Sequence, residues 1–112
     1  MIQFLIIKIA NTMNVQIQTV HFEADSKLIE HVTAKIEKLK TFHDKIIGAE
    51  VYLKLDNLSH QVRDKVAEIK VYVPKHSYFV KHQSKTFEES FDLAFNSLVT
   101  QVKRSKEKLM VH

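Results

Sequence analysis

Histidine is the residue type of this chain with the widest chemical range, and the 112 residues include seven of them. Histidine binds transition metals and transfers protons near neutral pH. His76 and His82 lie six positions apart across a predicted hairpin, whereas His31, His43 and His60 belong to a helix, its end and a polar stretch. The sequence contains no H-x-H, no H-E-x-x-H, no histidine pair at i, i+4 and no cysteine. We therefore predict no metal site and interpret the histidines as surface residues.

Nucleophilic and phosphate-binding chemistry also lack the sequence context that they require. A single glycine, Gly48, and a single proline, Pro74, exclude a glycine-rich phosphate loop and a dinucleotide fingerprint. No nucleophile elbow surrounds any of the serines, which fall in capping positions, polar stretches or helix surfaces: Ser26, Ser59, Ser77, Ser84, Ser90, Ser97 and Ser105. We predict that the protein is not an enzyme and that it uses no cofactor and no small-molecule substrate.

The basic residues are the remaining candidates for function. Lysine and arginine number 17 against 13 acidic residues, which gives a formal net charge of +4. Two groups are concentrated on predicted helices: a polar stripe of Lys27, His31, Lys35 and Lys38, and a terminal cluster of Lys103, Arg104, Lys106 and Lys108. Such groups are typical of contacts with phosphates. A solvated helix face, or cations that complement a helix C-terminus, would give the same pattern, so charge alone leaves both interpretations open.

The elements that must position these residues follow from the spacing of apolar side chains. Alternating and helical periodicities predict, in chain order, a strand at 15–22, a helix at 26–42, strands at 50–56, 66–73 and 78–84, and a helix with an apolar stripe from Phe87 to Val102. We expect Asp25 or Ser26 to cap the first helix and Ser84 or Thr86 to cap the second. The order β-α-β-β-β-α predicts an α+β two-layer sandwich, with both helices on one face of a mostly antiparallel four-stranded sheet. Its open face would carry Glu50, Tyr52, Lys54, Glu68, Lys70 and Tyr72.

Residues 1–12 stand apart from this pattern. Their apolar cluster is too short for a membrane span, and it lacks the basic start and the cleavage site of a signal peptide. Met13 offers a second plausible start. We predict that residues 1–12 are an extension, either a mis-called start or disordered, and that residues 13–112 form one domain of a cytoplasmic protein without a membrane partner. Intact-mass analysis of the native protein would decide where it starts.

Several segments, taken in order, resemble the ribosome hibernation promoting factor family, also called the ribosome-associated inhibitor or sigma-54 modulation protein family. These are MNVQIQTVHFEADSKLIEHVTAKIEKLKTF, KIIGAEVYLKLDN, VAEIKVYVP and SKTFEESFDLAFNSLVTQVKRSKEKL, which cover nearly all of 13–109. On the last helix the family character is matched by Phe87, Glu88, Glu89, Asp92, Leu98, Gln101, Lys103 and Lys106. Ser90, Asn96 and Thr100 depart from it. The chain looks like the short form of the family.

The resemblance implies a fold similar to double-stranded-RNA-binding domains and a specific mode of action. Such proteins bind the small ribosomal subunit in the channel of transfer RNA and messenger RNA, and they inhibit translation by occlusion. The partners would be the small subunit and the whole ribosome, with a monomer away from the ribosome. The stripe and the cluster would contact ribosomal RNA phosphates, with Lys54, Lys70, Lys81 and Lys85 as further candidates. A generic RNA-binding module, or an adaptor that binds proteins through the open sheet face, remains an alternative.

Overall fold

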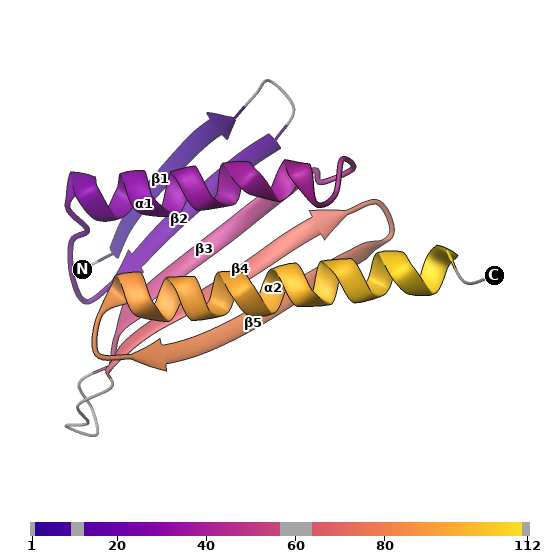
Figure 1. The fold of residues 1–112 in the computed structure, drawn as a ribbon. Helices are drawn as coiled ribbons and strands as arrows, with labels where there is room; N and C mark the ends of the chain where they lie inside the picture. The colour runs from indigo at the N-terminus through magenta and orange to yellow at the C-terminus, as the bar shows by residue number, and fades with distance from the viewer. Residues whose placement is uncertain (1, 10–12, 57–63, 111–112) are drawn as a thin grey trace.

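Two layers make up the protein, a five-stranded sheet and a pair of helices that cover one of its faces (Figure 1). The structure, a computed structural model, describes residues 2–9, 13–56 and 64–110, with the backbone alone for 7–9, 13 and 106–110. The elements are β1 (Ile2–Ile9), β2 (Met13–Val20), α1 (Ser26–Glu37), the 3-10 helix η1 (Lys38–Thr41), β3 (Gly48–Leu55), β4 (Lys65–Val73), β5 (His76–Ser84) and α2 (Phe87–Met110).

The strand order β1-β2-β3-β4-β5 follows the chain order. Every neighbouring pair is antiparallel except β2 and β3, which run parallel with Val15 opposite Ala49. A parallel pair requires a crossover, and α1 supplies it by returning the chain over one face. The predicted two-layer α+β architecture is confirmed, and the sheet is mixed.

The prediction of four strands is wrong, because Ile2–Ile9 adds β1 at the edge beside β2. The order is therefore β-β-α-β-β-β-α. The Gln3 side-chain oxygen accepts hydrogen bonds from Thr19 Oγ1 at 3.3 Å and from the Ala24 backbone at 2.9 Å. Leu5 packs against the core, whereas Ile2, Phe4 and Ile6 are exposed. Of the N-terminal segment, residues 1 and 10–12 lie outside the described residues, and the choice of start stays a prediction.

Removal of residues 1–12 is expected to leave a folded four-stranded domain that is less stable by about 1–3 kcal/mol. Among the residues whose side chains the structure describes, the buried core lies on later elements, so the truncated chain loses the backbone pairing of β1 with β2, the Leu5 packing and the hydrogen bonds of Gln3. Urea denaturation of both chains, followed by circular dichroism, measures the difference. A truncated chain that does not fold cooperatively would show that β1 is an essential part of the core.

The first helix begins and ends for local reasons. Asp25 accepts a hydrogen bond from the Leu28 backbone at 2.9 Å, which confirms one of the two predicted caps. The α-helix ends at Glu37 rather than near Phe42, and η1 carries the chain to Thr41. The predicted apolar stripe is buried at Leu28, Val32, Ile36 and Leu39, and Ile29 is partly buried.

The second helix is fixed to the sheet along most of its described length. Thr86 Oγ1 accepts from the Glu89 backbone at 3.1 Å, as one of the two predicted caps would. Its predicted stripe is buried at Phe91, Ala94, Phe95, Leu98 and Val102, with Phe87 partly buried. Ser90 is also buried, and its hydroxyl donates to the Lys65 carbonyl at 2.6 Å, which ties α2 to β4.

The β4–β5 hairpin is tighter than predicted. Val73 pairs with His76, so only Pro74 and Lys75 form the turn, and β5 begins at His76 rather than at Tyr78. Lys75 has a φ of 66°, which suits the third position of a type II turn after proline. The turn between β4 and β5 lies at the end of the molecule where α1 ends, close to the later turns of α2 (Figure 1).

Candidate RNA interface

The two helices lie side by side and run in the same direction. Four contacts between residues 22–42 and residues 87–103 show this. As the residue number rises along the first segment, the number of its partner on the second segment rises too. Phe22 stacks on Phe87 with ring centroids 4.0 Å apart, and His31 Nε2 lies 2.7 Å from Asp92 Oδ1. Farther along, Lys35 Nζ lies 5.6 Å from the centre of the Phe95 ring, and Lys103 Nζ lies 5.0 Å from the centre of the Phe42 ring. Both C-terminal ends therefore point to one end of the molecule.

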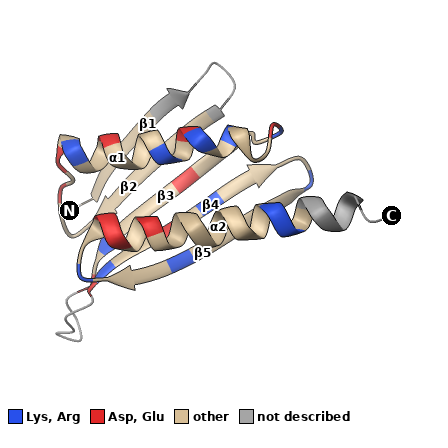
Figure 2. Ribbon diagram, viewed as in Figure 1, with Lys and Arg blue, Asp and Glu red and all other residues tan. Residues whose placement is uncertain are grey.

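Charge is segregated along α2, whereas α1 carries both signs, with Lys27 in its first turn and Glu37 at its last residue. Glu88 and Glu89 occupy the first turn of α2, whereas Lys103 and Arg104 follow four turns later (Figure 2). Lys35 lies in the last turn of α1, and Lys38 and Lys40 follow in η1. Each helix dipole favours this arrangement, because its C-terminal end carries partial negative charge. We call the cationic region the basic end, which consists of Lys35, Lys38, Lys40, Lys103 and Arg104.

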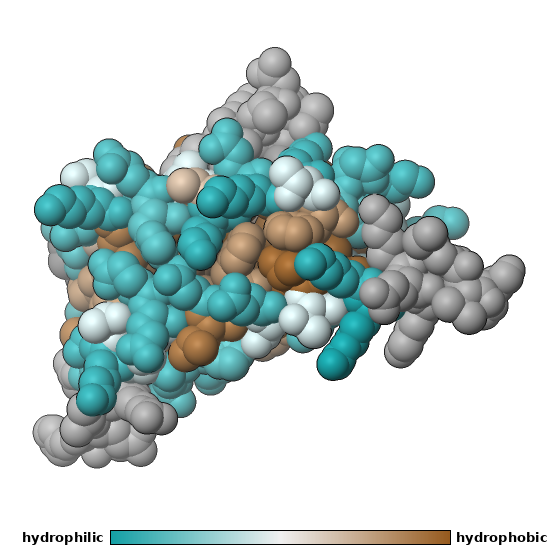
Figure 3. Space-filling model, viewed as in Figure 1, coloured by the Kyte–Doolittle hydropathy of each residue, from teal (hydrophilic) through white to brown (hydrophobic). Residues whose placement is uncertain are grey.

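Aromatic rings beneath the basic end hold two of its ammonium groups. Apolar side chains lie between the helices, with hydrophilic ones on either side (Figure 3). Lys35 lies over the Phe95 ring and Lys103 over the Phe42 ring, so both cations border this apolar strip. The negative face of a ring attracts a cation without neutralising its charge. The two lysines are thus oriented while they still attract an anion.

Two members of the predicted stripe are already paired. His31 and Lys35 both approach Asp92 on α2, at 2.7 Å and 3.8 Å, and all three side chains are about one-third exposed. Lys27 and Lys38 are exposed at opposite ends of the stripe. The stripe therefore faces α2 in its middle and solvent at its ends. Asp92 is the carboxylate that competes with any phosphate for Lys35.

The other predicted lysines do not join the basic end. Lys54, Lys70 and Lys81 lie on the sheet face opposite to the helices, and Lys85 is exposed just before α2, at its acidic end. Lys54 forms an ion pair with Glu68 at 2.7 Å, and Lys70 lies 5.2 Å from the centre of the Tyr72 ring. Lys106 and Lys108 continue α2, but their side chains lie outside the described residues. The sequence patterns did not identify Lys40 as a site residue, although it lies two positions after Lys38 and carries the same charge.

The open sheet face, predicted from the alternation of residues, has a hydrogen-bonded centre. Tyr52 and Tyr72 both donate hydrogen bonds to the carboxylate of Glu50, the latter at 2.9 Å. The hydrogen bond to Glu50, together with burial and the carboxylate charge, raises the pKa of Tyr52 to about 12. The tyrosine rings are thus held by a carboxylate, which disfavours an anion at this spot.

Substitution Glu50→Gln is expected to return the pKa of Tyr52 from about 12 toward its ordinary value of 10.0. The unfolded chain releases this proton near pH 10 and the folded chain near pH 12, so the folded state holds more protons in between. The stability contributed by the raised pKa is therefore lost as pH rises through that window. Tyrosinate absorbance against pH, recorded for the natural chain and the variant, measures the pKa of Tyr52. Identical titration curves would contradict the pairing.

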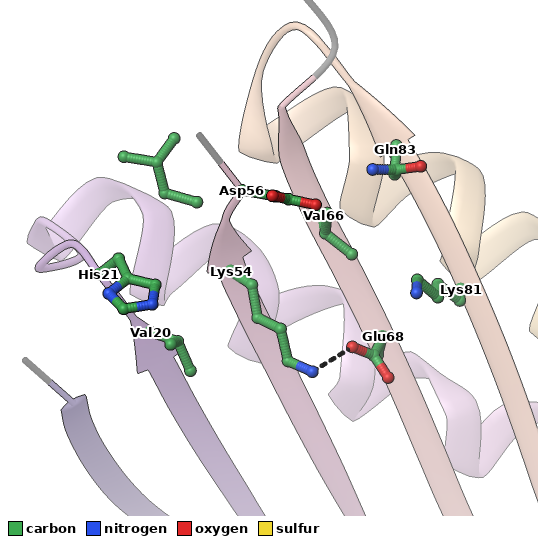
Figure 4. A pocket seen from close by; sticks show the side chains of 9 residues that line it. Val20, His21, Lys54, Asp56, Val66, Glu68, Lys81 and Gln83 are labelled. Atoms are coloured by element: carbon green, nitrogen blue, oxygen red, sulfur yellow. Dashed lines mark ion pairs between the residues drawn. The ribbon is translucent and has the colours of Figure 1, made fainter. Parts of the chain in front are cut away.

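A cavity of about 510 Å³ opens on the same face, near the ends of β2, β3 and β4 (Figure 4). Val20 and Val66 contribute apolar wall, and Figure 4 shows Lys54 reaching across to Glu68. Lys81, Gln83, His21 and Asp56 add polar groups of both signs. The lining is therefore balanced in charge, unlike the basic end.

Neither a metal centre nor a membrane-spanning segment is found in the part of the chain that the structure describes. Its histidine and carboxylate side chains form no group of three or more that could hold a metal ion. None of its helices has both the length and the apolar character needed to cross a bilayer.

Comparison with known proteins identifies relatives by sequence and by fold. The sequence model described as "Sigma 54 modulation protein / S30EA ribosomal protein" matches residues 15–110. No curated protein sequence matches the chain. A ribosomal subunit interface protein from Coxiella burnetii has a similar structure, with a TM-score of 0.71 and 18% identity, over 83% of this chain and 97% of that one. The Protein Y N-terminal domain from Thermus thermophilus gives 0.66 and 26%, over 77% and 92%.

Proposed function

Because the chain belongs to the sigma 54 modulation protein / S30EA ribosomal protein family, we propose that it is a ribosome hibernation factor. It binds the small ribosomal subunit and the whole ribosome in the cytoplasm, and it inhibits translation by occupying the channel of transfer RNA and messenger RNA at the decoding region. It acts by occlusion, without chemistry. The observation that carries the proposal is the basic end, where two parallel helices bring their cations together above a rigid core.

The basic end is the proposed contact with ribosomal RNA. Lys38, Lys103 and Arg104 are exposed and accessible to a phosphate, whereas Lys35 must exchange its contact with Asp92 for one. Lys106 and Lys108 extend the contact along α2, and Lys27 and His31 extend it along α1. Lys54, Lys70 and Lys81 on the open sheet face, and Lys85 just before α2, stay further candidates for RNA contacts away from the basic end.

Co-sedimentation with ribosomes through a salt series tests the proposal. We expect binding to the small subunit and to the whole ribosome, with log affinity that falls linearly with log salt by about 0.7–0.9 per phosphate contacted. A translation reaction supplied with the purified protein should slow in proportion to occupancy. Absence of binding at low salt would overturn the proposed function.

Substitution Asp92→Asn is expected to strengthen ribosome binding by about two- to fivefold, because it frees Lys35 from a competing carboxylate. It should cost less than about 1 kcal/mol of stability, since the ion pairs of Asp92 are partly exposed. Affinity at one fixed salt concentration measures the gain. Glu88→Gln makes the same charge change one turn earlier and serves as control, and an equal gain there would refute the local explanation.

Docking of a protein partner on the open sheet face is the second candidate function. The charge-balanced cavity of about 510 Å³ favours it, together with the exposed side chains of Phe79 on β5 and Phe4 on β1. Such binding would tolerate salt that releases RNA. Ribosome binding that is insensitive to salt and is lost in Phe79→Ala would therefore favour this second candidate over the first.

A further inference from the structure

A second cavity, of about 370 Å³, lies at the same end of the molecule as the basic end, where three parts of the chain meet. The segment after η1 contributes one side, the β4–β5 turn another, and a late turn of α2 the third. The lining residues are His43, Lys45, Val73, Pro74, His76 and Ser105. None of them was identified as a site from the sequence, because residues so far apart share no motif.

Every polar side chain in this lining can donate a hydrogen bond. The Lys45 backbone N–H donates to His43 Nδ1 at 3.1 Å, so a neutral His43 ring carries its proton on Nε2. The Lys45 ammonium, the His76 ring and the Ser105 hydroxyl are further donors. Among the residues whose side chains the structure describes, no carboxylate lines the cavity; Asp44, which lies between His43 and Lys45 in the sequence, is exposed and is not among the lining residues.

Contacts within the protein hold the two histidine rings before any ligand arrives. The His43 backbone N–H donates to the Leu39 carbonyl at 3.0 Å, and the His43 ring accepts from Lys45. The His76 ring packs edge-on against Tyr78, with centroids 4.7 Å apart, and its backbone is fixed by pairing with Val73. Donors that are ordered in advance lose less entropy when they bind.

We propose that this cavity, the His43–His76 site, binds a phosphate group. A phosphate offers several acceptor oxygens and negative charge, which complements a described lining whose four polar side chains can each donate a hydrogen bond and include a lysine. Lys103 and Arg104 precede Ser105 on α2, so a backbone phosphate here would continue the path of RNA from the basic end. The assignment to RNA rests on the proposed function, whereas the phosphate chemistry rests on the lining alone.

Nuclear magnetic resonance of the full chain tests the site in two titrations at low salt, one with inorganic phosphate and one with a short oligouridylate. We expect the ring signals of His43 and His76 to shift in both. The double variant K45A/H76A should weaken the response by about fivefold or more. K45A/S105A, which leaves the His76 packing intact, should give the same direction of change. K85A removes one cation at the far end and serves as control.

The outcomes separate the site from the proposed function. Shifts with phosphate and oligouridylate that are weakened in both double variants, as followed on the His43 ring, support an RNA phosphate site. A response to inorganic phosphate alone supports the anion site and overturns its assignment to RNA. No shift at these histidines, or an equal loss in K85A, overturns the site altogether. Ribosome binding is measured separately, so its absence would sink the proposed function without deciding whether phosphate binds here.

Discussion

The double charge reversal K103E/R104E is expected to weaken binding to the small ribosomal subunit by about tenfold or more at moderate salt. Both side chains are exposed, and the reversal turns two of the five cations of the basic end into anions. The salt slope should decrease by about two phosphate contacts, because those contacts no longer form. Co-sedimentation of the variant through the same salt series measures both quantities.

A matched reversal on the other side of the molecule controls for net charge. K81E/K85E changes the total charge by the same amount, but Lys81 lies on the open sheet face and Lys85 at the acidic end of α2. We expect it to alter binding by less than about threefold. The circular dichroism of both variants should match that of the natural chain, because none of the four residues is buried. Equal loss of binding in the two variants would refute the basic end as the contact.

Sequence periodicity predicted most elements because one face of each is buried. The stripe of Leu28, Val32 and Ile36 and the alternation of Val51 and Leu53 are direct consequences of packing on one core. Strand β1 escaped prediction for a physical reason. Its apolar residues occupy both faces, with Leu5 against the core and Phe4 exposed, so no clear alternation of polar and apolar residues marks it as a strand.

The candidate site was only partly predictable, because periodicity assigns residues to faces but not to neighbours. His31 and Lys35 were placed on one stripe, yet their partner Asp92 is more than fifty positions away and depends on how the helices align. The same alignment puts Phe42 under Lys103. Lys54 and Lys70 carry the same charge as these residues, but strand pairing places them on the opposite face beside Glu68 and Tyr72.

Substitution Phe91→Ala is expected to destabilise the protein by about 3–5 kcal/mol. Phe91 is fully buried at the centre of the α2 stripe, with its ring centroid 6.1 Å from that of His31 and 6.2 Å from that of Phe95. Truncation leaves a cavity between α2, α1 and the sheet, which the surrounding close-packed side chains fill only partly. The loss is a large fraction of the roughly 5–15 kcal/mol that stabilises a domain of this size.

Leu93 provides a matched control on the same helix. Its side chain is 41% exposed, so Leu93→Ala removes apolar volume of similar kind from the solvent side and should cost less than about 0.5 kcal/mol. Urea denaturation of the two variants measures the contrast directly. The position of Lys103 over Phe42 depends on the seating of α2, so Phe91→Ala should also reduce ribosome binding at temperatures where the variant is still folded. A cost below about 1 kcal/mol for Phe91→Ala would mean that α2 is not anchored to the sheet by this ring, and the alignment that creates the basic end would lose its structural basis.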